Sequence, residues 1–189
     1  MSYHLASQLI GYLWTITAIY WIVRAFGNKR TKTRRNRLLR ILTFLILWAT
    51  FATIQSQNGI DVPIISANDA TRLLGVTLCA TGLALAIWSR YILGRNWSGF
   101  VVIKEEHELI QRGPYTVIRH PLYTGLILGL IGTNLALFPT THGIILIAVW
   151  IIAFYIKARA EERILTQEFG DQYTRYKQQV TAALIPFLL

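Results

Sequence analysis

Residues 112–125, with the sequence RGPYTVIRHPLYTG, crowd polar and aromatic side chains into one short stretch of the chain. The stretch carries two arginines, a histidine and two tyrosines directly before a long apolar run. After that run, Glu161 and Glu162 are adjacent in the segment KARAEERIL. Ionised carboxylates accept strong hydrogen bonds, including those from an ammonium group or from ribose hydroxyls. A helix beginning near His120 would instead favour an anionic group at its N-terminus. These residue types predict a binding pocket with one wall for anions and one for cations.

The composition indicates that the elements that position these residues lie in a bilayer, since 53% of the residues are hydrophobic and only 15% are charged. Stretches 5–23, 41–59 and 73–89 contain no charged residue, and each is about as long as one membrane crossing of roughly 20 residues. A fourth stretch, 121–156, would form a straight helix of about 54 Å, far longer than a hydrocarbon core of about 30 Å. We therefore predict that it folds back at the FPTTHG sequence of residues 138–143.

The resulting fold class is an all-α integral membrane protein with five transmembrane helices, in which spans four and five form a tight helical hairpin. The basic residues orient it. With the N-terminus outside, 18 of the 19 Lys and Arg residues lie on the inner side, as the positive-inside rule requires. The C-terminus is then cytoplasmic. We expect one integrated domain, with an N-terminal two-span region (1–72) that carries a basic cytoplasmic loop and a catalytic membrane core (73–189).

The predicted hairpin would bring residues 112–125 and 157–165 to the same inner face of the membrane. Each polar group also has a plainer interpretation that the sequence leaves open. Arg119 could be an interface anchor whose charged end reaches toward water. The two tyrosines of the stretch could belong to an aromatic belt, and the two glutamates could be a solvated helix turn.

Several function classes find little support in this sequence. None of the four histidines is paired with another at the spacing of a helical metal site, so we predict no metal. The basic loop of residues 24–40 lies between two predicted spans and has no interleaved aromatic residues for base stacking, which argues against nucleic acid. Membrane lipids with anionic headgroups are its expected partners.

Residues 93–125 and 161–187 together closely resemble the isoprenylcysteine carboxyl methyltransferase family and its phospholipid methyltransferase relatives. The resemblance covers roughly the C-terminal half of the chain. It rests on the motifs H-x-L-[VI], G-x-Y and R-H-P-x-Y, and on a helical E-E followed by F-G-x-x-Y-x-x-Y.

The resemblance implies that S-adenosylmethionine is the cofactor, bound at the cytosolic side and partly covered by the C-terminal segment. The residues that it places at the cofactor are His107, Leu109, Ile110, Tyr115, His120, Pro121, Tyr123 and Glu161. The family commonly carries an arginine near the acceptor, four residues before the first glutamate, where this chain has Lys157, with Arg159 two residues further on. Lysine keeps the charge but lacks the planar fork that suits a carboxylate.

The predicted function is therefore methyl transfer from S-adenosylmethionine to a lipid-like or prenylated membrane acceptor, either a carboxylate or an amine. For an amine acceptor, Glu162 or a water near it would take up the proton. A small membrane reductase of the sterol type using NADPH is the alternative, and a non-catalytic protein on the same scaffold is a further one. We expect a prokaryotic plasma membrane rather than an endoplasmic reticulum membrane, and the oligomeric state stays open.

Overall fold

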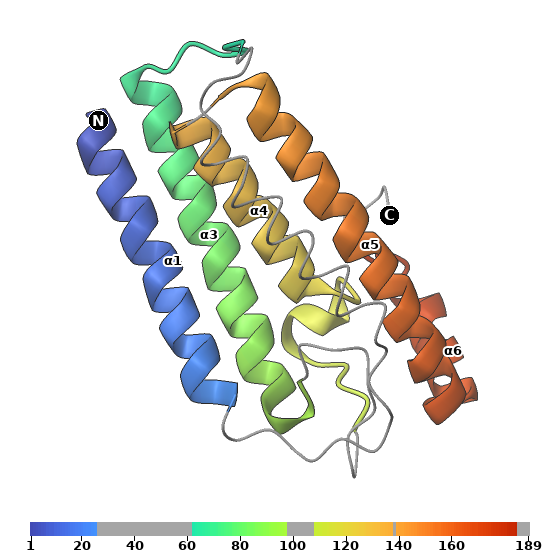
Figure 1. Cartoon of the computed structure of the whole chain (residues 1–189). Coiled ribbons are helices and arrows are strands. Elements are labelled where there is room, and N and C mark those ends of the chain that lie inside the picture. Colours follow the sequence, from blue (N-terminus) through green and yellow to red (C-terminus); the bar gives the residue numbers. More distant parts are fainter. Residues whose placement is uncertain (26–61, 98–107, 138, 185–189) are drawn as a thin grey trace.

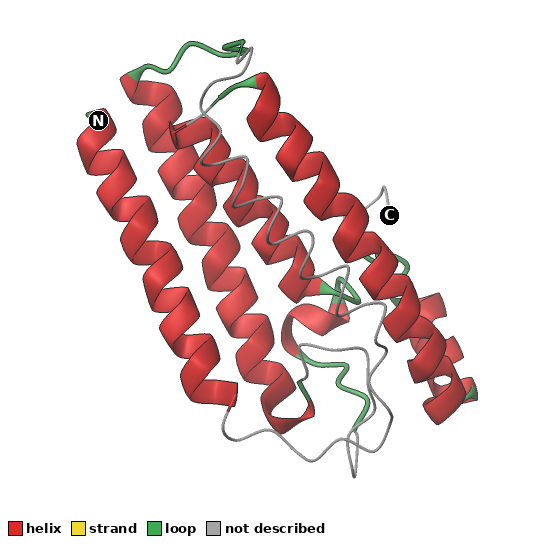
Figure 2. Cartoon of the chain, viewed as in Figure 1, coloured by secondary structure: helices red, strands yellow, loops and turns green. Residues whose placement is uncertain are grey.

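The computed structural model describes residues 1–25, 62–97, 108–137 and 139–184, and helices joined by loops make up this part of the chain (Figures 1 and 2). The only strand-like pairing in these ranges is a single bridge between Pro63 and Thr140. The prediction of an all-helical protein is thus confirmed. The helices are α1 (Tyr3–Ala25), α3 (Asp69–Leu93), α4 (Pro121–Leu137), α5 (Thr141–Phe169) and α6 (Asp171–Gln179), with short 3-10 turns at Gly94–Asn96 and Gly113–Thr116.

Among the described residues, three helices are long and apolar enough to cross a membrane, namely α1, α3 and α5. The apolar helix α4 has 17 residues, which gives it a length of about 26 Å. The span predicted at residues 41–59 lies outside the described residues. The count of five spans and the outward N-terminus therefore stay predictions.

The predicted break inside the fourth apolar stretch is confirmed, since α4 ends at Leu137 and α5 begins at Thr141. Backbone hydrogen bonds tie this turn to the segment before α3, where the Ile64 N–H donates to the Pro139 carbonyl and the Thr141 N–H donates to the Val62 carbonyl. Helix α5 is longer than the charge-free stretch that predicted it. Residues 157–169 are mostly good helix formers such as Ala, Arg, Glu and Leu, so the helix continues past the apolar span.

Helices α3 and α4 form the closest contact of the bundle, and glycines make it possible. A Cβ atom added to Gly82 would lie 2.6 Å from the Gly129 backbone nitrogen and 2.7 Å from the Gly125 carbonyl oxygen. Seven residues earlier, about two helical turns away, a Cβ atom added to Gly75 would likewise meet the backbone of Gly132 and Ala136. Small residues let two backbones approach closely in lipid, where dispersion contacts replace the hydrophobic effect between helices.

The order of the helices collects the polar residues at one end of the bundle. Helices α1, α3 and α5 run in the same direction and α4 runs in the opposite one (Figure 1). At one end the N-terminal ammonium lies 3.1 Å from Asp69. At the other end the fully buried Arg90 donates hydrogen bonds to the carbonyls of Arg24 and Gly94. This second end also carries the start of α4, the end of α5 and all of α6.

Replacing Gly82 by alanine should destabilise the bundle, because the new methyl group would meet the backbone of α4. We expect a lower thermal midpoint in detergent and a cost of about 1–3 kcal/mol, the usual range for overpacking. The matched control is Gly11→Ala in α1, where an added Cβ meets no atom of the described residues within 4 Å. Alanine is the better helix former there, so the control should keep or raise the midpoint. Equal midpoints for the two variants would contradict this account of the α3–α4 contact.

Candidate functional site

The stretch before α4 is held rigidly by a turn and by two tyrosines. Gly113 has φ +61°, a conformation that glycine adopts without strain, and a 3-10 turn follows it. Tyr115 in that turn is buried, its hydroxyl lies 3.4 Å from the Ser89 carbonyl oxygen, and its own carbonyl accepts a 2.7 Å hydrogen bond from the Tyr176 hydroxyl. Burial raises the pKa of Tyr176 to about 12, which keeps this donor protonated at neutral pH. The loop is thereby fixed between α3 and α6.

His120 lies between the two glutamates of α5. Its Nδ1 is 3.6 Å from Glu161 Oε2 and its Nε2 is 3.6 Å from Glu162 Oε1, and both are ion-pair separations longer than a hydrogen bond. His120 directly precedes Pro121, the first residue of α4, where the missing N–H of proline costs nothing. The prediction that the hairpin brings residues 112–125 next to residues 157–165 is confirmed.

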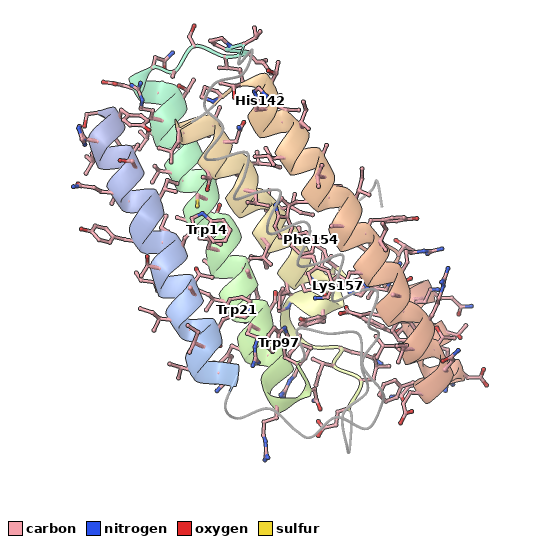
Figure 3. All side chains as sticks on the ribbon, in the orientation of Figure 1. Trp14, Trp21, Trp97, His142, Phe154 and Lys157 are labelled. Carbon is pink, nitrogen blue, oxygen red and sulfur yellow. The ribbon has the colours of Figure 1, made fainter. Side chains whose placement is uncertain are left out.

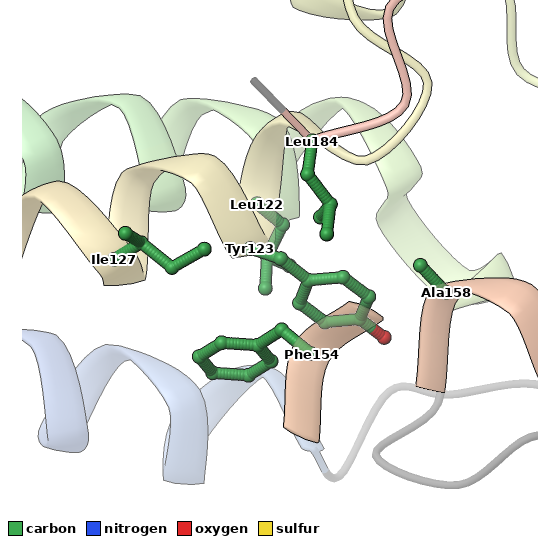
Figure 4. Packing of buried hydrophobic residues seen from close by; sticks show 6 residues of the cluster. All are labelled: Leu122, Tyr123, Ile127, Phe154, Ala158 and Leu184. Atoms are coloured by element: carbon green, nitrogen blue, oxygen red, sulfur yellow. The ribbon is translucent and has the colours of Figure 1, made fainter. Parts of the chain in front are cut away.

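Tyr123 joins this polar cluster to the apolar interior. Its hydroxyl donates a 2.6 Å hydrogen bond to Glu161 Oε1. Its ring stacks on His120 with centroids 5.7 Å apart. It also stacks on Phe154, with centroids 5.0 Å apart; Figure 4 shows Tyr123 and Phe154 together. The three rings form a ladder that begins at the carboxylates and ends among the buried side chains of Leu122 and Ile127.

The second glutamate is surrounded by cations. Glu162 is almost fully buried, and its Oε1 accepts a 2.7 Å hydrogen bond from the Arg119 guanidinium. Arg159 and Lys177 approach its other oxygen at 3.5 and 3.9 Å. The interpretation of Arg119 as a water-facing interface anchor is therefore wrong. Its side chain is 8% exposed and turns inward, because the buried carboxylate compensates its charge there.

The C-terminal segment, residues 180–184, lies across the start of α4. The backbone N–H groups of Arg119 and His120 donate to the carbonyls of Ala182 and Ala183, both at 2.9 Å. Below them, the Thr124 hydroxyl donates to the Leu184 carbonyl. This arrangement corrects the expectation that amides at the start of α4 face an anion. The N–H groups of residues 119 and 120 are already used by the chain's own C-terminal segment.

The remaining predicted site residues fall into three groups. Leu109 packs against Tyr173, Tyr176 and Val180 rather than against the glutamates, while Ile110 is half-buried in the same loop. The Lys157 Nζ atom lies over the Tyr123 ring, 5.2 Å from its centroid. Figure 3 shows Lys157 on α5 close to Phe154. The prediction for His107 lies outside the described residues.

Sequence reasoning overlooked two side chains of this site, Lys177 and Thr124, and it did not predict which contacts would hold the expected C-terminal cover. Thr124 and residues 180–184 take part through contacts between segments about 60 residues apart, and Lys177 takes part through a contact between α6 and α5. The one available signal was the F-G-x-x-Y-x-x-Y motif, whose two tyrosines, Tyr173 and Tyr176, prove to be the buried face of α6.

Several observations show what this site can hold. The Glu161 side chain is 21% exposed, so its carboxylate has room for a further donor besides Tyr123 and His120. His120 Nε2 is buried and has no hydrogen-bond partner among the described residues. No group of three or more potential metal ligands occurs in the same residues. An accessible carboxylate beside a cation suits a zwitterionic or hydroxyl-bearing organic ligand.

Fold and site together define a class of protein: an all-helical membrane protein with a buried cluster of charged residues at one end of its helix bundle. Residues 70–172 match the family described as Phospholipid methyltransferase. The chain belongs to that family, and the resemblance noted from its motifs is confirmed.

Curated relatives carry a more specific name. The chain is 34% identical to the protein-S-isoprenylcysteine O-methyltransferase of Saccharomyces cerevisiae over 68% of its own length and 55% of the relative's. It is 32% identical to protein-S-isoprenylcysteine O-methyltransferase B of Arabidopsis thaliana over 60% of its own length and 58% of the relative's. A probable protein-S-isoprenylcysteine O-methyltransferase of Oryza sativa subsp. indica is 26% identical over 89% of the chain and 88% of the relative. The chain thus spans a little over half the length of the first two.

The position of His120 predicts a pH dependence. Burial lowers its pKa, but the two neighbouring glutamates raise it more, so the pKa of His120 lies above its ordinary value of 6.5. A raised pKa in the folded state means that the stabilisation is complete below pH 6.5 and is lost as the pH rises through the raised value. We expect the thermal midpoint of the wild type to exceed that of His120→Gln by less at pH 9 than at pH 6. A constant difference across this range would contradict the predicted pairing.

Proposed function

We propose that this protein is an integral membrane methyltransferase that transfers a methyl group from S-adenosylmethionine to a lipid-like or prenylated acceptor. The observation that carries the proposal is the Glu161 carboxylate, which is partly exposed at the end of the bundle between the Tyr123 hydroxyl and the His120 ring. The family match and the methyltransferase names of the relatives support it.

The charged groups of the site fit such a cofactor. In the proposal, Glu161 accepts hydrogen bonds from the ammonium group or from the ribose hydroxyls. His120 borders the cofactor at the start of α4 in this proposal, while its two ring nitrogens face Glu161 and Glu162. The turn that contains Tyr115 and the start of α4 at Pro121 hold these groups in place. When bound, S-adenosylmethionine supplies an electrophilic methyl group on a sulfonium sulfur.

The chain's own contribution to catalysis would be alignment and exclusion of water. The stacked rings of Tyr123 and Phe154 close the site on its apolar side, and a fixed near-attack geometry can lower a barrier by several kcal/mol. A lipid tail would approach from the bilayer, along the apolar residues of α4 and α5. The site would open to the cytoplasm, since the basic residues of α5 and α6 gather at the same end.

The acceptor group faces Lys157 in this proposal, and Arg159 lies two residues further along α5 on a different face of the helix. Relatives named protein-S-isoprenylcysteine O-methyltransferase favour a carboxylate acceptor. Glu162 is a poor candidate for taking a proton from an amine, because Arg119, Arg159 and Lys177 surround its carboxylate. The absence of a free proton acceptor at Glu162 thus also favours a carboxylate over an amine as the methyl acceptor. The family match does not favour the NADPH-dependent reductase, and a prokaryotic plasma membrane stays a prediction.

Calorimetric titration of the detergent-purified protein with S-adenosylhomocysteine is the direct test. We expect saturable binding that weakens at least tenfold in Glu161→Gln, because the neutral amide loses the charge-assisted hydrogen bonds. The matched control is Glu168→Gln, which removes an exposed carboxylate of the same helix. A separate titration with NADPH should give no heat of binding. Binding of NADPH alone would overturn the proposal in favour of a reductase.

Lys157→Ala should separate acceptor handling from cofactor binding. We expect S-adenosylhomocysteine affinity within about twofold of wild type, and turnover of N-acetyl-S-farnesylcysteine reduced at least tenfold, because the cation opposite the acceptor carboxylate is lost. Methyl transfer is measured with radiolabelled cofactor. Lys157→Arg should retain or improve turnover, since it restores the planar fork. Equal turnover in all three proteins would remove Lys157 from the acceptor site.

A further inference from the structure

The two adjacent glutamates of α5 have different surroundings. Glu161 keeps a partly exposed carboxylate that contacts Tyr123 and His120, whereas Glu162 is 3% exposed and contacts cations from three segments. A carboxylate with so little exposure and so many partners has no free face for a ligand. Its contacts point to a role in assembling the site.

Arg119 connects Glu162 to the C-terminal segment by hydrogen bonds to both. One guanidinium nitrogen, Nε, donates to Glu162, while another donates to the carbonyls of Val180 and Thr181 at 2.6 Å each. The adjacent backbone amides of residues 119 and 120 bind the next two carbonyls of the same segment. Arg119 can hold both groups at once because its donors form a planar fork.

The held segment in turn packs on the ring ladder. Leu184 is fully buried against Tyr123 and Phe154 (Figure 4). Val180 closes the other end of the segment against Tyr173 and Tyr176 of α6. The position of residues 180–184 therefore fixes both the backbone before His120 and the ring of Tyr123.

We infer that Glu162 is a positioning residue, which acts through Arg119 to hold residues 180–184 across His120 and Tyr123, while Glu161 alone of the pair contacts the cofactor. The inference rests on the proposed function for its cofactor-binding half. The contacts that Arg119 makes with residues 180–184 exist in the unliganded chain, so they can be tested without any ligand.

Amide hydrogen exchange in detergent tests the holding directly. In Glu162→Gln, the amides of Arg119 and His120 should exchange at least tenfold faster than in wild type, because their acceptors leave with the released segment. Glu161→Gln and the exposed Glu168→Gln should each stay within twofold of wild type. The amides of Gly75–Gly82 in α3 report whether the bundle itself remains folded.

A charge series distinguishes electrostatic holding from simple packing. Glutamine matches glutamate in size but lacks its charge, whereas aspartate keeps the charge on a shorter side chain. If the charge holds Arg119, Glu162→Asp should exchange more like wild type than Glu162→Gln does. The reverse order would assign Glu162 a packing role and overturn the inference. If Glu162→Gln also loosens α3, Arg119→Lys provides the same test, since it keeps the charge without the fork.

Titration with S-adenosylhomocysteine completes the experiment. We expect at least a tenfold loss of affinity in Glu162→Gln together with faster exchange, and the same loss in Glu161→Gln with unchanged exchange. Lost affinity without faster exchange in Glu162→Gln would mean that Glu162 contacts the ligand itself, and faster exchange with unchanged affinity would uncouple the segment from the site. Either result overturns the inference. Absence of binding by the wild type would instead overturn the proposed function, while the exchange rates would still decide how the segment is held.

Discussion

The burial of one carboxylate governs the architecture of the polar end of this bundle. An uncompensated charge in a weakly polar interior is costly, and removing one partner of a buried ion pair typically costs about 3–5 kcal/mol. The buried Glu162 carboxylate is therefore stable only when cations from other parts of the chain lie close to it. It finds Arg119 before α4, Arg159 on its own helix and Lys177 on α6. The segment before α4, the end of α5 and helix α6 meet because of this requirement.

A second constraint comes from lipid, which gives helices little reason to associate through apolar surface alone. The glycines of α3 and α4 meet this constraint by letting the two backbones touch, and Trp14 adds α1 through a 2.9 Å hydrogen bond to Thr133. This tightly packed half of the bundle is a rigid base. The looser contact of α4 with α5 is where the polar cluster and the ring ladder lie. A rigid base with a charge-assembled site beside it suits chemistry that depends on alignment.

The ladder of rings joins the polar cluster of the two glutamates to the apolar interior. His120 touches the carboxylates, Tyr123 donates to Glu161 and stacks on both neighbours, and Phe154 continues into the apolar layer. Each ring thus has a polar neighbour on one side and an apolar neighbour on the other. A methyltransferase with a polar donor and a lipid-like acceptor needs such a boundary, because the two substrates come from different solvents.

Much of this protein was determined by its sequence alone. Stretches without charge predicted the helices at 5–23 and 73–89, Pro139 marked the hairpin, and the R-H-P-x-Y and E-E motifs indicated the family, whereas Gly143, expected in the turn, lies inside α5. Such features are local, because they follow from solvent, chain length and backbone chemistry. The tertiary structure alone decided how the two glutamates differ, why Arg119 turns inward and where residues 180–184 lie. Those outcomes depend on which distant partner compensates a buried charge, and no local pattern encodes that choice.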